Sequence, residues 1–139
     1  ELEQFIQSKG LQDRVMLPGS KNRIQEHIKD AALFVLSSDY EGIPNALIEA
    51  MAIGLPCVST DCSPGGAREL INDGENGVIV DCGNSDALAK AMVLLLEDRE
   101  KAQKMGINAK KIRRRVDKEL VCDRWLDFIM DCRRKENEC

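Results

Sequence analysis

The chain alternates between short apolar runs and segments with a helical pattern. The apolar runs are rich in Val, Ile and Leu, and they cover residues 14–19, 33–38, 57–61 and 77–81. Nearly continuous apolar runs of this length are typical of strands that are buried on both faces, as in a parallel sheet. Each run is followed by polar or glycine residues and then by a helical pattern, at about 22–32, 44–53, 66–72 and 85–97. This alternation predicts βαβ units, and therefore an α/β fold with a parallel sheet of about four strands.

The rest of the chain is also predicted to be helical. A first helix ends at Gly10, and two more follow at about 99–115 and 117–134. The helix at 85–97 is expected to start from a cap at Asn84 or Ser85. In the last helix, apolar side chains at helical spacing are interpreted as core positions: Leu120, Trp125, Phe128 and Ile129. The 139 residues have the size of one domain and show no repeat or linker, so 1–139 is treated as a single domain.

The charge balance argues against a nucleic-acid-binding protein, because the formal net charge is -4 rather than basic. A basic run nevertheless stands near the C-terminus: Lys110, Lys111, Arg113, Arg114 and Arg115. A solvated helix face is the favoured interpretation of this run, and a contact with anionic lipid or a phosphorylated partner is the alternative. No apolar run approaches the roughly 18 residues needed to span a bilayer, and no signal-peptide pattern is present.

The six cysteines form no C-x-x-C pair, and none lies near the single histidine, His27. This pattern argues against a zinc site, and no metal is expected. Cys57 and Cys82 belong to or border apolar runs, where a free cysteine behaves as a small hydrophobe. We therefore expect reduced thiols and a cytoplasmic location. An ordinary packed or exposed role is expected for His27, which lies in a helical pattern.

The loop after the second apolar run has the features of an anion site. Pro44 suits the first turn of the following helix, where its missing N–H costs nothing. The amides of the next three residues, Asn45, Ala46 and Leu47, would then be free donors. Free amides at a helix N-terminus attract phosphate, and Gly42 would let the backbone come close to a ligand.

Two carboxylates flank these amides. Glu41 stands in the loop, and Glu49 lies about one turn into the helix. A carboxylate beside a phosphate should repel it, so we expect both acids to accept hydrogen bonds from ligand hydroxyls such as those of a sugar or a ribose. For Glu49 the alternative is an ordinary helix-surface acid. Its neighbours are all apolar, however, so a buried carboxylate there would need a partner, and the pattern leaves both interpretations open.

Two further loops are weaker signals. The turn Pro64-Gly65-Gly66 precedes a helix whose first turn contains Glu69, an acid that could simply stabilise the helix N-terminus. The turn Pro18-Gly19-Ser20 follows the first apolar run. In doubly wound sheets, ligands bind beyond the carboxyl ends of the strands, which is where all these loops are predicted to lie.

Several motifs in order resemble one enzyme family. Glu41 and Glu49 form an E-x7-E pair, and Glu49 opens the phrase E-A-M-A-x-G-x-P. The pair Gly65-Gly66 precedes an acid by three residues, and N-G-x-x-V follows at 76–80. Over about residues 11–130, the chain is similar to the nucleotide-sugar-binding C-terminal domain of retaining glycosyltransferases of family 4 (glycosyl transferases group 1), which have the GT-B architecture. The resemblance implies a Rossmann-like three-layer αβα fold.

The resemblance also implies a reaction and a site. A sugar would pass from a nucleoside-diphosphate sugar to an acceptor with retention at the anomeric carbon, without a metal or other cofactor. UDP-sugar is the favoured donor and GDP-sugar the alternative. Glu41 would be the catalytic residue and contact the donor sugar, and Glu49 would bind the ribose hydroxyls. Backbone groups would hold the sugar and the diphosphate at Gly42, Ile43, Pro44, Asn45, Ala46 and Leu47, and Gly19 and Ser20 would face the base.

The chain departs from the family pattern in two ways. Many members have glycine where this chain has Pro44, and Pro-Asn variants at this place suggest enzymes of bacterial capsule, lipopolysaccharide or exopolysaccharide biosynthesis. The family's upstream Gly-Arg…Lys segment and the N-terminal acceptor domain are not matched. We therefore expect an incomplete C-terminal lobe that is inactive alone and whose sheet lacks strands between 14–19 and 33–38.

The unmatched domain carries further expectations. It would bind a saccharide or lipid-linked saccharide acceptor, and it could attach the enzyme peripherally to the inner face of the membrane. Two other classes remain open at this stage. One is a nucleotide-sugar epimerase of GT-B architecture, and the other is a non-catalytic α/β module that binds a nucleotide or a protein.

Overall fold

The computed structural model describes residues 1–137, and a small parallel sheet lies at its centre. The three strands are β1 (Phe34–Leu36), β2 (Cys57–Thr60) and β3 (Val78–Val80), in the order β1-β2-β3. All pairs are parallel, and Val35, Val58 and Val78 lie side by side across the sheet. The predicted α/β fold with a parallel sheet is confirmed.

The prediction of a fourth strand at 14–19 is wrong. This segment forms no strand, and it begins in a turn where the amides of Arg14 and Val15 both donate to the Leu11 carbonyl, each at 2.9 Å. Met16 is 86% exposed. An apolar run becomes a strand only where a neighbouring strand and a core receive it, and within the described residues β1 pairs with β2 alone.

The helices account for most of the remaining chain. Those that precede β3 are α1 (Leu2–Ser8), α2 (Ile24–Ile28), α3 (Asn45–Ile53) and α4 (Gly66–Leu70). Those that follow β3 are α5 (Ser85–Glu97), α6 (Arg99–Ala109), α7 (Ile112–Arg115) and α8 (Lys118–Asn137). The predicted helix 22–32 is thus much shorter, and the predicted helix 99–115 is divided into α6 and α7. Asn84 caps α5, since its side chain accepts a hydrogen bond from the Ala87 amide at 2.9 Å.

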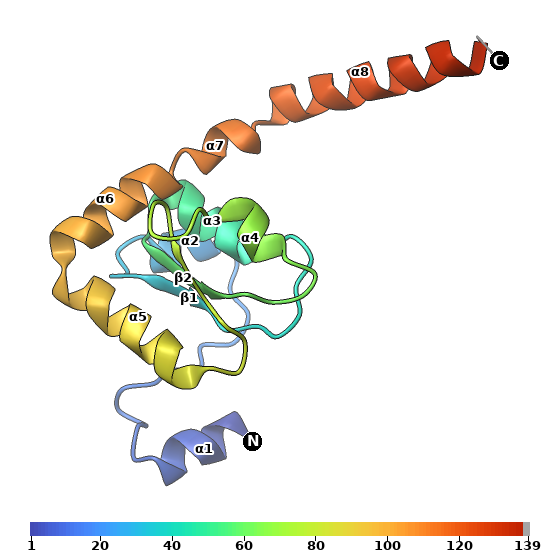
Figure 1. Ribbon diagram of the computed structural model, residues 1–139. Coiled ribbons are helices and arrows are strands. Elements are labelled where there is room, and N and C mark those ends of the chain that lie inside the picture. Colours follow the sequence, from blue (N-terminus) through green and yellow to red (C-terminus); the bar gives the residue numbers. More distant parts are fainter. Residues whose placement is uncertain (138–139) are drawn as a thin grey trace.

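Helices cover both faces of the sheet and make three layers (Figure 1). On one face, Leu47 and Met51 of α3 form a buried cluster with Cys57, against which Phe34 and Leu36 pack. On the other face, Val58 packs in a second cluster with residues of α5 and α6: Leu95, Ala102 and Met105. Because successive side chains of a strand point to opposite faces, β2 supplies both clusters and is buried along its whole length.

A close backbone contact joins α6 to the end of α3. Gly54 ends α3 in the left-handed conformation with φ 92°. A Cβ at Gly106 of α6 would lie only 2.2 Å from the Gly54 carbonyl oxygen. Glycine at 106 therefore lets α6 pack directly on the turn that leads into the amino end of β2.

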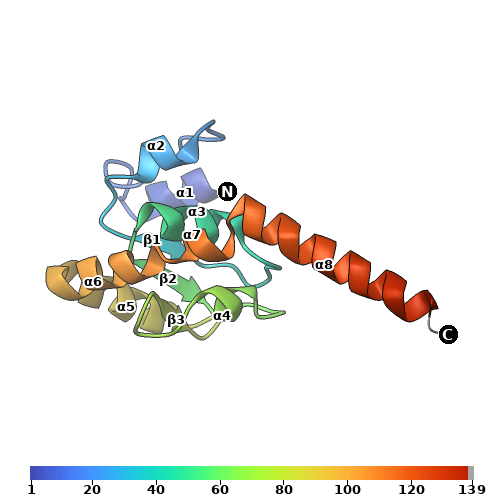
Figure 2. The same ribbon diagram turned by 90° about the horizontal axis from the view of Figure 1, so that it is seen from above.

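The C-terminal helix does not join the core. α8 projects away from the rest of the molecule (Figures 1 and 2). Trp125 is 61% exposed and Phe128 60% exposed, and their rings contact each other edge to face with 6.0 Å between centroids. The interpretation of Leu120, Trp125, Phe128 and Ile129 as core positions is therefore wrong, because helical spacing defines an apolar face but not what covers it. None of the described helices combines the length and apolarity that a bilayer crossing requires.

The cysteines differ in their surroundings. Cys57 and Cys62 are buried free thiols, and burial raises the pKa of Cys57 to about 12. Cys82 is exposed, so the expectation that it packs as a small hydrophobe is wrong. Cys139 lies outside the described residues.

The contact at Gly106 generates a stability prediction. Gly106→Ala would gain about 1 kcal/mol of helix propensity, but the added Cβ must displace the Gly54 carbonyl, and overpacking costs about 1 to 3 kcal/mol. We expect a lower free energy of unfolding by urea denaturation. The exposed Gln103→Ala in the same helix is the control and should change it by less than about 0.5 kcal/mol. A Gly106→Ala protein more stable than the parent would contradict the contact.

Candidate functional site

The carboxyl ends of the three strands meet at one edge of the sheet. Thr60, at the end of β2, donates its hydroxyl to the Ser38 carbonyl at 2.5 Å. The Cys82 thiol, just after β3, donates to the same carbonyl at 3.7 Å. Ser38 lies just beyond β1, so one carbonyl ties the three strand ends together. The loops that follow the strands therefore form one continuous edge, where ligands bind in folds of this class.

Glu41 is held at this edge by both its backbone and its side chain. Its amide donates to the Ser63 carbonyl at 2.9 Å, beside the parallel bridge between Tyr40 and Ser63. One carboxylate oxygen, Oε1, accepts a hydrogen bond from the Ser38 hydroxyl at 2.9 Å. The side chain is half-buried. These contacts fix the position of the carboxylate before any ligand is bound.

A close approach of two glycines sets the distance between the loops. A Cβ at Gly66 would lie 1.5 Å from the Gly42 carbonyl oxygen and 3.2 Å from the Ile43 Cα. No side chain fits there, so glycine at 66 is required for the N-terminus of α4 to touch the loop that carries Glu41. The adjacent Gly65 has φ 102°, a conformation that favours glycine as well.

The N-terminus of α3 differs slightly from the sequence prediction. Pro44 is the N-cap with φ -75° and ψ 106°, one position before the first helical turn in which it was expected. Its carbonyl accepts hydrogen bonds from the amides of Leu47 at 3.1 Å and Ile48 at 3.2 Å. The Leu47 amide is therefore not free, contrary to expectation. Asn45 and Ala46 are exposed in the first turn, where amides lack intrahelical partners.

Glu49 lies half-buried in α3, next to the buried Ala50 and one turn beyond Pro44. No ion pair among the described residues involves its carboxylate. A half-buried carboxylate without an opposite charge favours a partner from outside the chain. The structure thus keeps the ligand interpretation open and gives no packed partner that would replace it.

The structure does not bring Gly19 and Ser20 to this edge through a strand. Both are exposed, and Gly19 has φ 66°. Because 14–19 is not a strand, the turn is not the carboxyl end of one. The role of Gly19 and Ser20 in facing the base, which the resemblance implies, stays a prediction. The roles assigned to the remaining residues of the loop and of α3 stay predictions.

One charged pair at this edge was not identified from the sequence. Arg68 of α4 donates from Nε and Nη2 to the two carboxylate oxygens of Asp61, at 2.5 and 2.6 Å. The hydrogen bonds from Arg68 hold the pKa of Asp61 below its usual value. Asp61 follows β2 directly, a position that could have marked it, but Arg68 belongs to another element, α4, so no regular spacing within one helix or strand predicts the pair.

The N-G motif before β3 has a structural role. Asn76 accepts from the Asn72 amide at 2.7 Å and donates to the Leu70 carbonyl at 3.1 Å. Gly77 lies against Ile71, whose side-chain atoms would stand 3.0 Å from an added Cβ. These contacts close the turn into β3 at the edge opposite to Glu41. The N-G-x-x-V motif, one of those on which the family resemblance rests, therefore stabilises the fold and does not contribute to the site.

Comparison with known proteins points to one family. The family model for glycosyl transferases group 1 matches residues 1–112. The N-acetyl-alpha-D-glucosaminyl L-malate synthase of Bacillus anthracis is 32% identical over 108 residues, which make up 78% of this chain and 28% of that protein. The N-acetylgalactosamine-N,N'-diacetylbacillosaminyl-diphospho-undecaprenol 4-alpha-N-acetylgalactosaminyltransferase of Campylobacter jejuni is 31% identical over 131 residues, 94% of this chain and 35% of that protein.

Solved structures agree with this comparison. The crystal structure of Anabaena HepE in complex with UDP matches with a TM-score of 0.88 at 29% identity, covering 94% of this chain and 36% of that chain. The complex of the same protein with UDP-glucose matches with a TM-score of 0.86. The chain thus spans about a third of the length of these relatives, namely 28%, 35% and 36%.

The contact between Gly66 and the Gly42 carbonyl predicts that an added methyl group destabilises the fold at position 66 but not at position 42. Gly66→Ala should lower the free energy of unfolding by about 1 to 3 kcal/mol, since the Cβ must push the Gly42 carbonyl away. Gly42→Ala is the matched control, because a Cβ at Gly42 meets nothing within 4 Å. It should cost less than about 0.5 kcal/mol. Equal effects of the two substitutions in urea denaturation would refute the contact.

The Asp61–Arg68 pair predicts a pH effect. Because the pKa of Asp61 is lowered in the folded chain, the pair stabilises the fold above the pKa of the unfolded carboxyl, and this is lost as pH falls through the folded pKa. Carbon-detected NMR titration should show the Asp61 pKa rising in Arg68→Gln. Arg23→Gln, which removes the partner of Glu26 in α2, should leave it unchanged. An Asp61 pKa that is insensitive to Arg68→Gln would show that the pair does not form in solution.

Proposed function

Because this chain belongs to the family of glycosyl transferases group 1, we propose that it is the donor-binding part of a retaining glycosyltransferase. The donor is a nucleoside-diphosphate sugar. The bond between the anomeric carbon and the diphosphate oxygen breaks, and a bond from that carbon to an acceptor hydroxyl oxygen forms with the same configuration. The acceptor hydroxyl gives its proton to the departing diphosphate oxygen, and the nucleoside diphosphate leaves.

The observation that carries this proposal is the placement of Glu41. Its carboxylate is fixed at the carboxyl edge of the sheet by Ser38, on a loop held against α4 by Gly66. In the proposed complex it contacts the donor sugar. Its negative charge favours the partial positive charge that develops on the anomeric carbon as the diphosphate departs.

The helix α3 supplies the other donor contacts. Its first-turn amides at Asn45 and Ala46, with those of Gly42 and Ile43 in the preceding loop, hold the diphosphate and sugar hydroxyls through directed donors and the positive end of the helix dipole. Pro44 has no N–H and shapes this loop without donating. Glu49 accepts hydrogen bonds from the ribose hydroxyls. A ribose rather than a phosphate at Glu49 avoids the repulsion that two negative groups would suffer.

UDP-sugar is the donor that we favour, with GDP-sugar as the alternative. Support comes from the similar Anabaena protein, whose structures contain UDP and UDP-glucose. We propose further that the acceptor is a saccharide or lipid-linked saccharide of bacterial polysaccharide biosynthesis, as the name of the Campylobacter relative suggests.

The chain spans about a third of the length of the Campylobacter relative, and we propose that the acceptor site lies on residues outside it. The 139-residue chain alone would then bind the nucleotide sugar without transferring its sugar. Catalysis needs both substrates held in one geometry. The reaction would take place in the cytoplasm, at the inner face of the membrane for a lipid-linked acceptor.

Donor binding can be tested by calorimetry with UDP and UDP-glucose on three variants. Glu49→Gln should weaken both ligands by about tenfold, since it removes a charge-assisted hydrogen bond to the ribose. Glu41→Gln should weaken UDP-glucose but not UDP, because only the sugar contacts this side chain. Glu3→Gln, an exposed acid of α1, is the control.

The outcomes separate the roles of the two acids. Equal affinity of the parent and Glu49→Gln for UDP would contradict the ribose contact. Equal loss of UDP and UDP-glucose in Glu41→Gln would contradict the sugar contact. Absence of binding of UDP, GDP and their sugars to the parent chain would refute donor binding altogether.

A further inference from the structure

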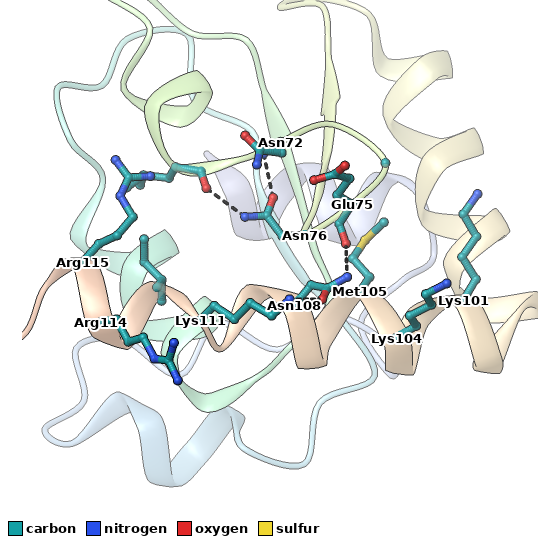
Figure 3. A pocket seen from close by; sticks show the side chains of 13 residues that line it. Asn72, Glu75, Asn76, Lys101, Lys104, Met105, Asn108, Lys111, Arg114 and Arg115 are labelled. Carbon is teal, nitrogen blue, oxygen red and sulfur yellow. Dashed lines mark hydrogen bonds between the residues drawn. The ribbon is translucent and has the colours of Figure 1, made fainter.

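A second concave site lies at the opposite edge of the sheet from Glu41. It is a cavity of about 920 Å³ between the turn that leads into β3 and the helices α6 and α7 (Figure 3). The turn precedes β3, and α6 packs on the turn before β2 through Gly106, so both belong to the amino edge of the strands. The cavity shares no residue with the proposed donor site.

The walls of the cavity carry a strong excess of positive charge. Five cations line it, namely Lys101, Lys104, Lys111, Arg114 and Arg115, against a single carboxylate, that of Glu75. The whole chain has a net charge of -4, so this concentration runs against the overall balance. Like charges gathered on one surface repel one another and cost stability.

The cations are not neutralised within the described part of the chain. None of the ion pairs between described residues includes any of the five. Lys111 donates to the Asn108 side-chain oxygen at 2.8 Å, and Arg115 donates to the Glu69 carbonyl at 2.7 Å. Both acceptors are neutral and orient the cations without cancelling their charge. In Figure 3, Arg114 points away from the turn, so the three lysines are the more direct candidates.

The floor of the cavity is apolar, which strengthens the electrostatic potential of the cations above it. Met105 is 2% exposed and Ile112 4% exposed, and Leu70 completes this apolar base. A cleft lined by one sign of charge over apolar walls focuses the electrostatic potential and raises the local concentration of counter-ions. Two of the three asparagines that line the cavity already have partners among the described residues. The Asn76 side chain bridges the Asn72 amide and the Leu70 carbonyl, and Asn108 of α6 donates to the Glu75 carbonyl at 3.1 Å. Recognition therefore falls mainly to the charged groups.

We propose that this basic cavity binds a ligand that carries two or more phosphate groups. A ligand with several phosphate groups can pair with several of these separated cations. A ligand with one carboxylate group would leave most of the positive charge of the cavity without a counter-charge. Lysine binds phosphate as a point charge. The same chemistry is offered by a free polyphosphate and by neighbouring headgroups of an anionic lipid surface, and the experiment distinguishes these sources.

The test uses the 139-residue chain and two triple variants of equal charge. The first is Lys101→Gln/Lys104→Gln/Lys111→Gln in the cavity. The second, Lys21→Gln/Lys29→Gln/Lys90→Gln, changes exposed lysines elsewhere and serves as the control. Tripolyphosphate is titrated by calorimetry, and vesicles of phosphatidylglycerol or phosphatidylcholine are used in co-sedimentation. Circular dichroism verifies that each variant is folded.

Saturable binding of tripolyphosphate, or of phosphatidylglycerol but not phosphatidylcholine vesicles, is expected for the parent chain and the control. The cavity variant should bind about tenfold or more weakly, because charge-assisted hydrogen bonds are lost. Binding should also weaken with rising salt. Tripolyphosphate binding indicates the free source, and vesicle binding alone indicates the lipid source. No binding of either probe, or equal weakening in both triple variants, overturns the proposal, as does tripolyphosphate binding that the cavity variant leaves unchanged.

Discussion

The close approach of Gly66 to the Gly42 carbonyl is the contact on which the site depends. It joins the loop after β1 to the start of the helix after β2, and only glycine allows the two backbones to come so near. Glu41 reinforces this joint, because its amide donates to Ser63. If the loops were held apart, the carboxylate of Glu41 would lose the surroundings that give it a defined position beside α3.

A second glycine plays a similar part at the other edge of the sheet. Gly106 packs on the carbonyl of Gly54, so α6 lies close to the turns that enter the strands. The two contacts hold both ends of a sheet that, within residues 1–137, consists of three short strands. The two edges of the sheet differ in their chemical groups. Glu41 and the first-turn amides of α3 lie at the carboxyl edge, and the five cations of the cavity lie at the amino edge. A nucleotide sugar and a polyphosphate would therefore meet different surfaces of one small domain.

Sequence patterns predicted an element correctly wherever burial and local preference agreed. The runs at 33–38, 57–61 and 77–81 form strands because helices cover both faces of the sheet. The run at 14–19 is equally apolar, but no described strand accepts it and its side chains are exposed. The apolar face of α8 failed as a core prediction for the same reason. Periodicity describes the element itself, whereas burial depends on whether another element lies against it.

The sequence alone determined the type of most elements, the spacing of Glu41 and Glu49, and the glycine pair before α4, from which the family could be inferred. These features are local, since they follow from backbone preferences and from the order of polar and apolar residues. Only the tertiary structure decided that Arg68 pairs with Asp61, and that lysines of α6 line one cavity with the turn before β3. Such contacts join groups that the chain brings together only by closing loops and packing helices, and their geometry is absent from any local pattern.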